Sequence, residues 1–283
     1  MTSTFAILKP FWRNKLSRVG LIILAIMVLT AIFAPMIAPY SPNNTTFPSM
    51  LGPSYAHWLG TTQAGQDVLS ELIYGSRQSL VVGFAAGIAA TLVGLVIGLI
   101  SGYLTGLVDD ILSYFINVFL VIPGLPLMII VAAYAPVHGS LLIIFVITVT
   151  GWAWGARVLR AQVTTLRSRD YVAAARFAGE GIFRIIFREI MPNMISLVAA
   201  SFLGAAVSAI LGAAGLEFLG LGDPSINSWG TMLYWAENSG ALLEGQWAWL
   251  FAPGFLIAVL GTALVLINFA VDEMANPRLR RRG

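Results

Sequence analysis

The sequence predicts an all-α membrane protein with six transmembrane helices. Of its 283 residues, 58% are hydrophobic and 10% are charged, whereas average soluble domains carry about 25% charged residues. The mean hydropathy is +0.84, and several stretches without Asp, Glu, Lys or Arg exceed the ~20 residues that a spanning helix needs. The composition therefore argues against a soluble enzyme, a nucleic-acid-binding protein and a disordered scaffold.

Five uncharged stretches predict the six helices, because one of them is long enough for two. As a single helix, the third stretch would be about twice as long as the membrane is thick, and Pro136, His138 and Gly139 interrupt it. We therefore expect two spans there, Ile111–Ala133 and Ser140–Ala156. The first stretch is longer than the ~7–15 residue core of a signal peptide, so we expect it to remain as a span. The five stretches are Val19–Tyr40, Gln78–Val108, Ile111–Ala156, Ile190–Leu216 and Gly245–Val271.

Basic residues predict the orientation of these helices. The chain has 16 Lys and Arg residues, and with six spans all of them except Arg77 fall on one side. The positive-inside rule makes that side cytoplasmic, so we expect a multi-pass cell-membrane protein with both termini in the cytoplasm. The basic groups are Lys9, Arg13, Lys15 and Arg18, then Arg157, Arg160, Arg167, Arg169, Arg176, Arg184 and Arg188, and finally Arg278, Arg280, Arg281 and Arg282. The outer side keeps Asp67, Glu71, Glu217, Asp223, Glu237 and Glu244.

The sequence shows no energy source of its own. No Lys follows Lys15, so the Gly-x-x-x-x-Gly-Lys-Ser/Thr loop that binds nucleotide phosphates does not occur. The predicted spans also lack the buried ionisable residues with which proton-coupled and ion-coupled carriers work. His57 and His138 lie in separate predicted loops, and we interpret both as solvated side chains rather than metal ligands. We therefore expect no catalytic residue, cofactor or metal, and any uphill transport must draw its energy from another subunit.

Small residues recur at every fourth position in two predicted spans. They are Gly94, Gly98, Gly102 and Gly106 in the second span, and Ala200, Gly204, Ser208 and Gly212 in the fifth. This spacing lines one helix face and lets two backbones approach closely. We interpret the second-span stripe as packing, whereas for the fifth span both packing and the lining of a translocation pathway stay open. Pro123, Gly124 and Pro126 interrupt the third span, and they predict either a plain kink or a bend at a pathway or gate.

The loop over residues 157–189, between the fourth and fifth spans, mixes charged and aromatic residues. Asp170 is predicted to cap a short helix over Tyr171–Ala178, and Gly179 follows where a helix ends in the left-handed conformation. Pro192 is expected to begin the next span, where its missing N–H costs nothing. A helix of this kind, held outside the membrane, suits a groove on another protein, and an alternative is a helix that lies on anionic lipid.

The run Tyr171-Val172-Ala173-Ala174-Ala175-Arg176-Phe177-Ala178-Gly179, followed by Ile190-Met191-Pro192-Asn193, resembles the EAA loop of ABC-importer permeases. Its Ala-Ala pair, Gly and Pro fall at the spacing of that motif, whereas Ala173 replaces the Glu and Met191 replaces the Leu. In such importers this loop forms the coupling helix that seats in a cleft of the ATPase subunit. The resemblance therefore implies contact with an ATPase through Asp170, Tyr171, Ala173, Ala174, Ala175, Gly179 and Pro192.

Further segments are similar to the C-type permease of oligopeptide, dipeptide and nickel importers. These segments are Phe11–Lys15, Ala34–Pro39, His57–Ser70, Ala156–Gln162, Phe218–Gly222 with Ser228–Gly230, and Asn276–Arg278. The resemblance implies a type I ABC-importer permease fold with a cytoplasmic coupling helix. It divides the chain into an N-terminal segment with the first span and an outer loop (1–75), a type-1 transmembrane domain (76–272) and a cytoplasmic basic tail (273–283).

The same resemblance implies the partners and the cargo. A B-type permease would complete the pathway as a heterodimer, two ATP-binding subunits would power it, and an extracytoplasmic binding protein would deliver a di- or oligopeptide. Nickel, glutathione or another small solute is the alternative cargo within the family. Two other classes stay open, a secondary carrier or channel that works alone and a purely structural membrane scaffold. On this interpretation the pathway-lining candidates are Pro123, Pro126, Ala200, Gly204, Ser208 and Gly212.

Overall fold

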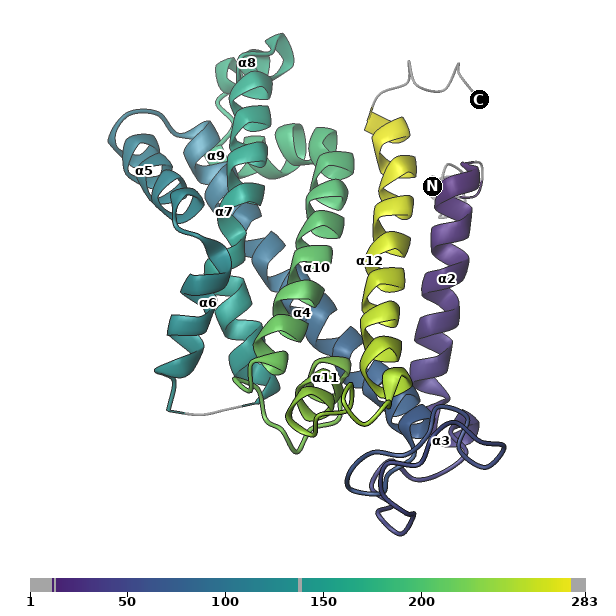
Figure 1. Ribbon diagram of the computed structural model, residues 1–283. Helices are drawn as coiled ribbons and strands as arrows, with labels where there is room; N and C mark the ends of the chain where they lie inside the picture. Colours follow the sequence, from purple (N-terminus) through teal and green to yellow (C-terminus); the bar gives the residue numbers. More distant parts are fainter. Residues whose placement is uncertain (1–11, 13, 137–138, 276–283) are drawn as a thin grey trace.

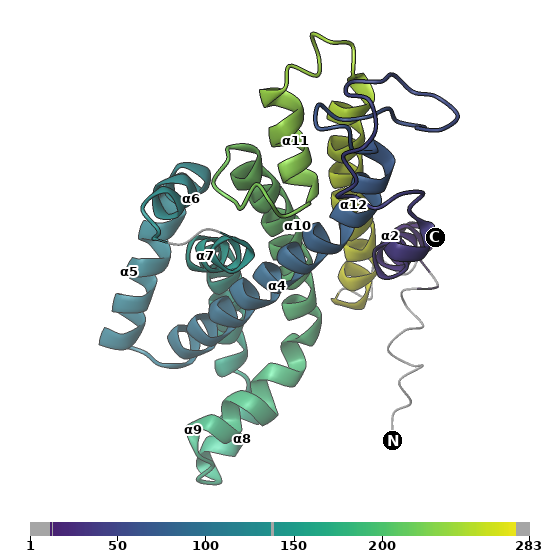
Figure 2. The same cartoon turned by 90° about the horizontal axis from the view of Figure 1, so that it is seen from below.

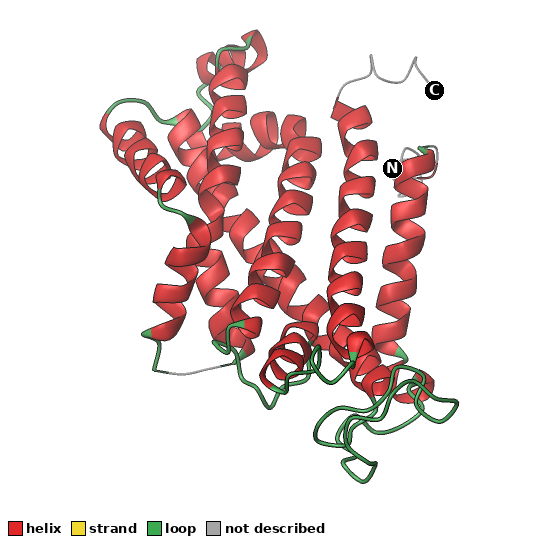
Figure 3. Ribbon diagram, viewed as in Figure 1, coloured by secondary structure: helices red, strands yellow, loops and turns green. Residues whose placement is uncertain are grey.

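The computed structural model describes residues 12, 14–136 and 139–275. Within these ranges the chain forms helices joined by loops and no strand (Figure 3), apart from one isolated bridge between Thr61 and Asp67. The described ranges do not include His138, Lys9, Phe11, Arg13 or the tail residues from Asn276 to Arg282 that carried some of the predictions above.

The helices confirm an all-α membrane fold. Four of them, α2, α4, α7 and α12, are each long and apolar enough to cross a membrane, and so is the continuous helical run Ile182–Phe218. Helices α5 and α6 pass the same test only as a pair, so the described residues hold five candidate spans, or six when this bent pair is taken as one span. The helices are α2 (Lys15–Ile32), α3 (Ala34–Ile37), α4 (Val68–Tyr103), α5 (Leu107–Val121), α6 (Gly124–Ala133), α7 (Ser140–Arg167), α8 (Asp170–Phe177), α9 (Ile182–Arg184), α10 (Ile195–Phe218), α11 (Trp229–Asn238) and α12 (Trp247–Ala275).

The predicted span Ile111–Ala133 is broken rather than straight. Its two helices, α5 and α6, meet at an angle of 92°. The residue before a proline avoids the helical conformation, and Ile122 accordingly has φ −70° and ψ 127°, while Pro123 caps the N-terminus of α6. The interruption by Pro123 and Gly124 is therefore a sharp bend and not a plain kink.

Several helices extend beyond the uncharged stretches. Helix α4 begins at Val68 instead of Gln78, because the Asp67 side chain caps it by accepting a hydrogen bond from the Ser70 amide (2.8 Å). Helix α7 continues past Ala156 to Arg167. Charged residues mark where a helix leaves the hydrocarbon and not where it ends, so the loop predicted over 157–189 is shorter than expected.

Helix α4 runs obliquely through the middle of the bundle, with α5, α6 and α7 on one side and α2 and α12 on the other (Figure 2). The stripe on α4 is a packing surface, as predicted. A Cβ atom at Gly94 would lie 2.9 Å from the Trp152 carbonyl oxygen of α7, and one at Gly98 would lie 2.9 Å from the Ala156 carbonyl oxygen. Gly106 does not belong to this stripe, because α4 ends at Tyr103 and Gly106 precedes α5 with φ +75°.

The two ends of the bundle differ in what they carry (Figure 1). The start of α2, the end of α12 and the short helix α8 lie at one end. The long loop from α3 to α4 and helix α11 lie at the opposite end. The described helices give five or six candidate spans, and the predicted number of six requires that α5 and α6 together make one of them.

Candidate functional site

Helix α8 projects from the end of the bundle that also holds the start of α2. It begins at Asp170, one residue before the predicted start, and its N-cap is Arg169, with no capping hydrogen bond from a side chain. The prediction that Asp170 caps the helix is therefore wrong. As the first helical residue, Asp170 instead places a negative charge where the helix dipole favours it.

The C-terminus of α8 has the predicted left-handed glycine. Gly179 has φ +79°, its amide donates to the Arg176 carbonyl (2.9 Å), and the Glu180 amide donates to the Ala175 carbonyl (3.1 Å). These two bonds form a Schellman motif. A Cβ atom at Gly179 would meet nothing within 4 Å, so the backbone conformation alone requires glycine here.

One face of α8 is fixed to the transmembrane bundle. Val172 is fully buried in an apolar cluster with Leu159 and Val163 of α7, and Ala175 packs against this cluster. The guanidinium of Arg176 lies 5.5 Å from the centroid of the Tyr103 ring at the end of α4. These contacts attach α8 to α4 and α7. No sequence motif marks the residues that make them, so the sequence did not predict the attachment.

Hydrogen bonds at the same end support the attachment of α8 and also join α5 to α7. The Arg176 Nη2 donates to the Arg167 carbonyl (3.1 Å), and the Arg167 Nη1 donates to the Tyr103 carbonyl (3.1 Å). Arg160 of α7 donates to both carboxylate oxygens of Asp109 in α5 (2.7 and 2.8 Å). The arginines that predicted a cytoplasmic side therefore also join neighbouring helices.

The other face of α8 is open. Phe177 is 94% exposed, and Tyr171 and Ala174 lie on the same face, at the i, i+3 and i+6 positions of the helix. Phe183 and Phe187, which follow in the chain, are also exposed. A rigidly held helix whose free face presents aromatic side chains has the properties of a protein-docking surface.

Pro192 does not begin the next span as predicted. It lies at the second position of a 3₁₀ turn, Met191–Met194, inside the continuous helical run that starts at Ile182. A π-helical segment, Ile185–Ile190, precedes it, and the Met191 amide donates to the Ile186 carbonyl. The hydrogen-bonding pattern changes at the residue that has no N–H to donate.

A cleft of about 330 Å³ opens between α4, α6, α7 and α10. Gly204 and Ser208 of the α10 stripe line it, and a Cβ atom at Gly204 would meet nothing within 4 Å. The hydroxyl of Ser201 is buried beside the cleft without a hydrogen-bond partner. Of the other predicted pathway residues, Pro123, Pro126, Ala200 and Gly212 do not line this cleft.

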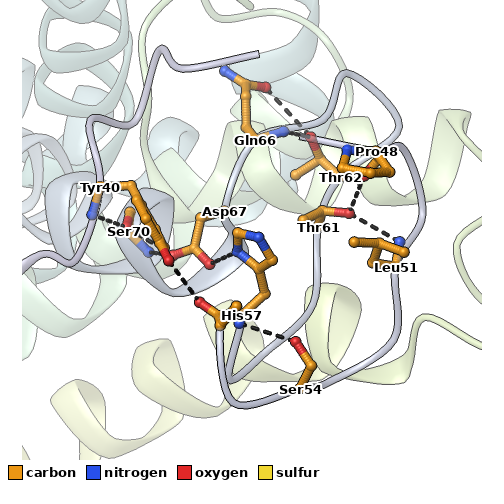
Figure 4. A network of polar contacts seen from close by, with 11 residues as sticks. Tyr40, Pro48, Leu51, Ser54, His57, Thr61, Thr62, Gln66, Asp67 and Ser70 are labelled. Atoms are coloured by element: carbon orange, nitrogen blue, oxygen red, sulfur yellow. Dashed lines mark hydrogen bonds and ion pairs between the residues drawn. The ribbon is translucent and has the colours of Figure 1, made fainter. Parts of the chain in front are cut away.

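The opposite end of the bundle has a buried polar network that the sequence interpretation missed (Figure 4). His57 is 5% exposed, and its Nδ1 lies 2.8 Å from Asp67 Oδ1. The prediction that His57 is a solvated loop residue is therefore wrong. Asp67 Oδ2 accepts a hydrogen bond from the Ser70 hydroxyl (2.7 Å), whose oxygen accepts one from the Tyr40 amide (3.0 Å). The network attaches the long α3–α4 loop to the first turn of α4.

A second buried acid lies at the same end. Glu217, at the end of α10, is 6% exposed and accepts a hydrogen bond from the Ser228 hydroxyl (2.6 Å) at the N-cap of α11. Two of the six acids that we expect on the outer side, Asp67 and Glu217, thus position loops rather than contribute to a solvated surface. In the part of the chain that the structure describes, no three His, Asp or Glu residues come close enough together to hold a metal ion.

Two sequence profiles of known families match this chain. Residues 94–281 match the sequence profile of the family described as binding-protein-dependent transport system inner membrane component. Residues 6–53 match that of the N-terminal TM domain of oligopeptide transport permease C.

Similar proteins cover nearly the whole chain. The dipeptide transport system permease protein of Escherichia coli (strain K12) is 41% identical over 97% of this chain and 94% of its own. The di/tripeptide transport system permease protein of Pseudomonas aeruginosa (strain UCBPP-PA14) is 34% identical over 96% of this chain and 93% of its own. The oligopeptide transport system permease protein of Bacillus subtilis (strain 168) is 33% identical over 96% and 88%. The chain therefore belongs to the family of binding-protein-dependent transport system inner membrane components, as a multi-pass ABC-transporter permease that is not itself the ATPase.

Proposed function

We propose that this permease imports di- or oligopeptides with energy from ATP hydrolysis on separate subunits. In this proposal a second, B-type permease completes the pathway, two ATP-binding subunits drive it, and an extracytoplasmic binding protein delivers the peptide. The observation that carries the coupling role is the two-sided character of α8. Its exposed face is free for an ATPase, while Val172 and Arg176 attach the other face to α4 and α7.

The attachment explains how a push on α8 would reach the membrane. Val172 shares its apolar cluster with Ile185, Ile190 and Met194, at the start of the run that becomes α10. A displacement of α8 therefore acts on α4, α7 and α10 together, and these three helices supply most of the cleft. We propose Asp170, Tyr171, Ala173, Ala174, Ala175, Gly179 and Pro192 as the coupling segment.

Gly204 and Ser208 are proposed to line the pathway inside the cleft. Pro123 and Pro126 are exposed at the bend between α5 and α6, where a second permease would reach them. Ala200 and Gly212 share the α10 stripe and are proposed to line the pathway above and below the cleft. The division of the chain at 1–75, 76–272 and 273–283 is part of the same proposal.

The peptide cargo is supported by the relatives, which are named as dipeptide, di/tripeptide and oligopeptide permeases. The test is uptake of a labelled dipeptide into proteoliposomes that contain this chain with its permease, ATPase and binding-protein partners. We expect uptake that requires ATP and all subunits and that unlabelled dipeptide competes away. Competition by nickel or glutathione but not by dipeptide would reassign the cargo, and ATP-independent uptake by this chain alone would indicate a secondary carrier.

We also propose that the α8 end faces the cytoplasm, because the segment 157–189 at this end carries seven arginines. The chain has no Cys, so single cysteines report without background. Ser168→Cys, next to α8, and Ser225→Cys, in the loop before α11, are both at exposed positions. We expect impermeant thiol reagents to label them from opposite sides of the membrane, and labelling of both from one side would contradict the six-span topology.

A further inference from the structure

The chain between α8 and α10 presents aromatic and basic side chains on one exposed face. Phe183 is 80% exposed and Phe187 is 55% exposed, and Arg184 and Arg188 beside them are exposed as well. These residues belong to α9 and to the π-helical segment that follows it. Because the members of each pair are four residues apart in a helical run, each pair lies on one face and the two pairs are neighbours. We call residues 182–190 the connecting segment.

The opposite face of the connecting segment sets its depth in the membrane. Ile185 and Ile186 are buried in the same apolar cluster as Tyr103, the last residue of α4. Arg160, which follows a member of this cluster in α7, forms an ion pair with Asp109 of α5. Helix α4 thus ends and charged residues begin at this level, as they do where a protein leaves the hydrocarbon. The connecting segment therefore lies at the membrane boundary.

The connecting segment does not continue the direction of α10. The run Ile182–Phe218 has 37 residues, and as a straight helix it would be about 55 Å long, whereas the hydrocarbon is ~30 Å thick. The π-helical segment and the 3₁₀ turn Met191–Met194 interrupt its α-helical hydrogen bonding, and such interruptions bend helices. Figure 2 shows α8 and α9 to the side of the bundle, away from α10. The connecting segment therefore runs along the boundary and not across the membrane.

The charges on the exposed face favour an anionic surface. Arg184 forms an ion pair with Glu180 (3.3 Å), whereas no described residue pairs with the guanidinium of Arg188. The one acid within the segment, Glu189, is half-buried. Aromatic and basic side chains on an exposed helix surface are typical of helices that lie in a membrane interface. There the rings enter the acyl boundary and the guanidinium groups meet lipid phosphates.

Helix α8 differs from the connecting segment in its depth. It lies farther out at this end of the bundle (Figure 1). It buries one residue, Val172, whereas the connecting segment buries three, Ile185, Ile186 and Ile190. We therefore assign the free face of α8 to a protein partner and the free face of the connecting segment to lipid.

We propose that the connecting segment binds anionic lipid at the membrane surface. Phe183 and Phe187 enter the acyl boundary, and Arg188, with support from Arg184, binds the lipid phosphate. This contact holds the link between α8 and α10 at the membrane surface. It does not depend on which solute the permease carries.

The test is quenching of a fluorophore by brominated lipids in the complete transporter. Single cysteines that carry bimane replace Phe187 or Phe177, in nanodiscs that contain dibromo-phosphatidylcholine or dibromo-phosphatidylglycerol. We expect both brominated lipids to quench bimane at residue 187, and the anionic lipid to do so at a lower mole fraction. Bimane at residue 177 is the matched control, because Phe177 is an exposed aromatic residue of α8. Neither lipid should quench it.

Arginine substitutions in the Phe187→Cys background test the headgroup contact. Arg188→Gln should reduce the preference for the anionic lipid about fivefold, as expected for one basic residue near an anionic surface. Arg184→Gln should reduce it less, because this guanidinium already pairs with Glu180. Arg169→Gln is the control, since Arg169 is an exposed arginine at the N-cap of α8, outside the connecting segment. It should leave the preference unchanged.

Two results would overturn the proposal. If neither brominated lipid quenches bimane at residue 187, protein and not lipid covers this face. If the two lipids quench it equally, and Arg188→Gln changes nothing, the arginines do not bind lipid phosphates. Stronger quenching at residue 177 than at residue 187 would also contradict it, because α8 would then be the segment in the membrane.

Discussion

Helices α4 and α10 both carry a small residue at every fourth position, and the structure places the two stripes in opposite surroundings. On α4, Gly94 and Gly98 lie against the backbone of α7, where a Cβ atom would come within 2.9 Å of a carbonyl oxygen. On α10, Gly204 and Ser208 line a cleft of about 330 Å³, and a Cβ atom at Gly204 would meet nothing within 4 Å.

The difference shows what a four-residue spacing does and does not specify. It aligns small side chains on one face of a helix, but it does not determine whether another backbone or an open space lies opposite. Gly179 adds a third case, in which glycine is needed for a dihedral angle and not for room. Substitution at each kind of glycine should therefore give a different result.

The largest effect on stability is expected at Gly98. Gly98→Leu places a side chain 2.9 Å from the Ala156 carbonyl oxygen and the Leu159 Cβ, so α4 and α7 must separate. Overpacking of this kind costs about 1–3 kcal/mol and sometimes more. The thermal unfolding midpoint of the purified complex should fall clearly, whereas the same substitution at Gly204 should leave it unchanged. Similar unfolding midpoints for the two variants would contradict the claim that the α4 stripe is packed and the α10 stripe faces open space.

A smaller destabilisation is expected at Gly179, where a β-branched residue must adopt φ +79°. The left-handed conformation costs about 1–2 kcal/mol for a non-glycine residue, so Gly179→Val should shift the end of α8 and reduce the amount of ATPase subunit that co-purifies. Gly181→Val is the matched control, because Gly181 has φ −69° and also meets nothing within 4 Å. Equal ATPase recovery from the two variants would remove the link between the α8 terminus and docking.

The smallest effect on stability, with a large effect on transport, is expected at Gly204. Gly204→Leu fills part of the cleft and replaces glycine by a better helix former. Peptide uptake should fall about tenfold, which corresponds to ~1.4 kcal/mol in activation free energy, while the unfolding midpoint is kept. Gly204→Ala should lie between this variant and the wild type. Normal uptake by Gly204→Leu would place the pathway elsewhere.

The features that the sequence predicted are those with a local cause. Uncharged length predicts the spans, and the alanine run followed by Gly179 predicts α8 and its end. For the interruption at Pro123, a plain kink and a bend at a pathway or gate were both open, because the proline sets the conformation of Ile122 but not the 92° angle between the two helices.

The features that it missed depend on residues distant in the chain. His57 looked like a solvated loop residue because its partner, Asp67, meets it only after the α3–α4 loop folds back on α4. The attachment of α8 depends on Arg176 and Tyr103, which lie on different helices. The assignment of Asp170 as a cap failed for a different reason, since helix ends shift by a residue without changing the pattern.

The measurement that tests the central claim most directly is the reactivity of single cysteines on α10 toward a charged, water-soluble thiol reagent. Ser208 lines the cleft, and Leu211 is also exposed in this chain but does not line it. In the reconstituted transporter we expect Ser208→Cys to react, and to react more slowly when peptide and its binding protein are present, while Leu211→Cys stays unreactive because lipid covers it. An unreactive Ser208→Cys beside a reactive Leu211→Cys would show that the α10 stripe faces a packed interface and not the pathway.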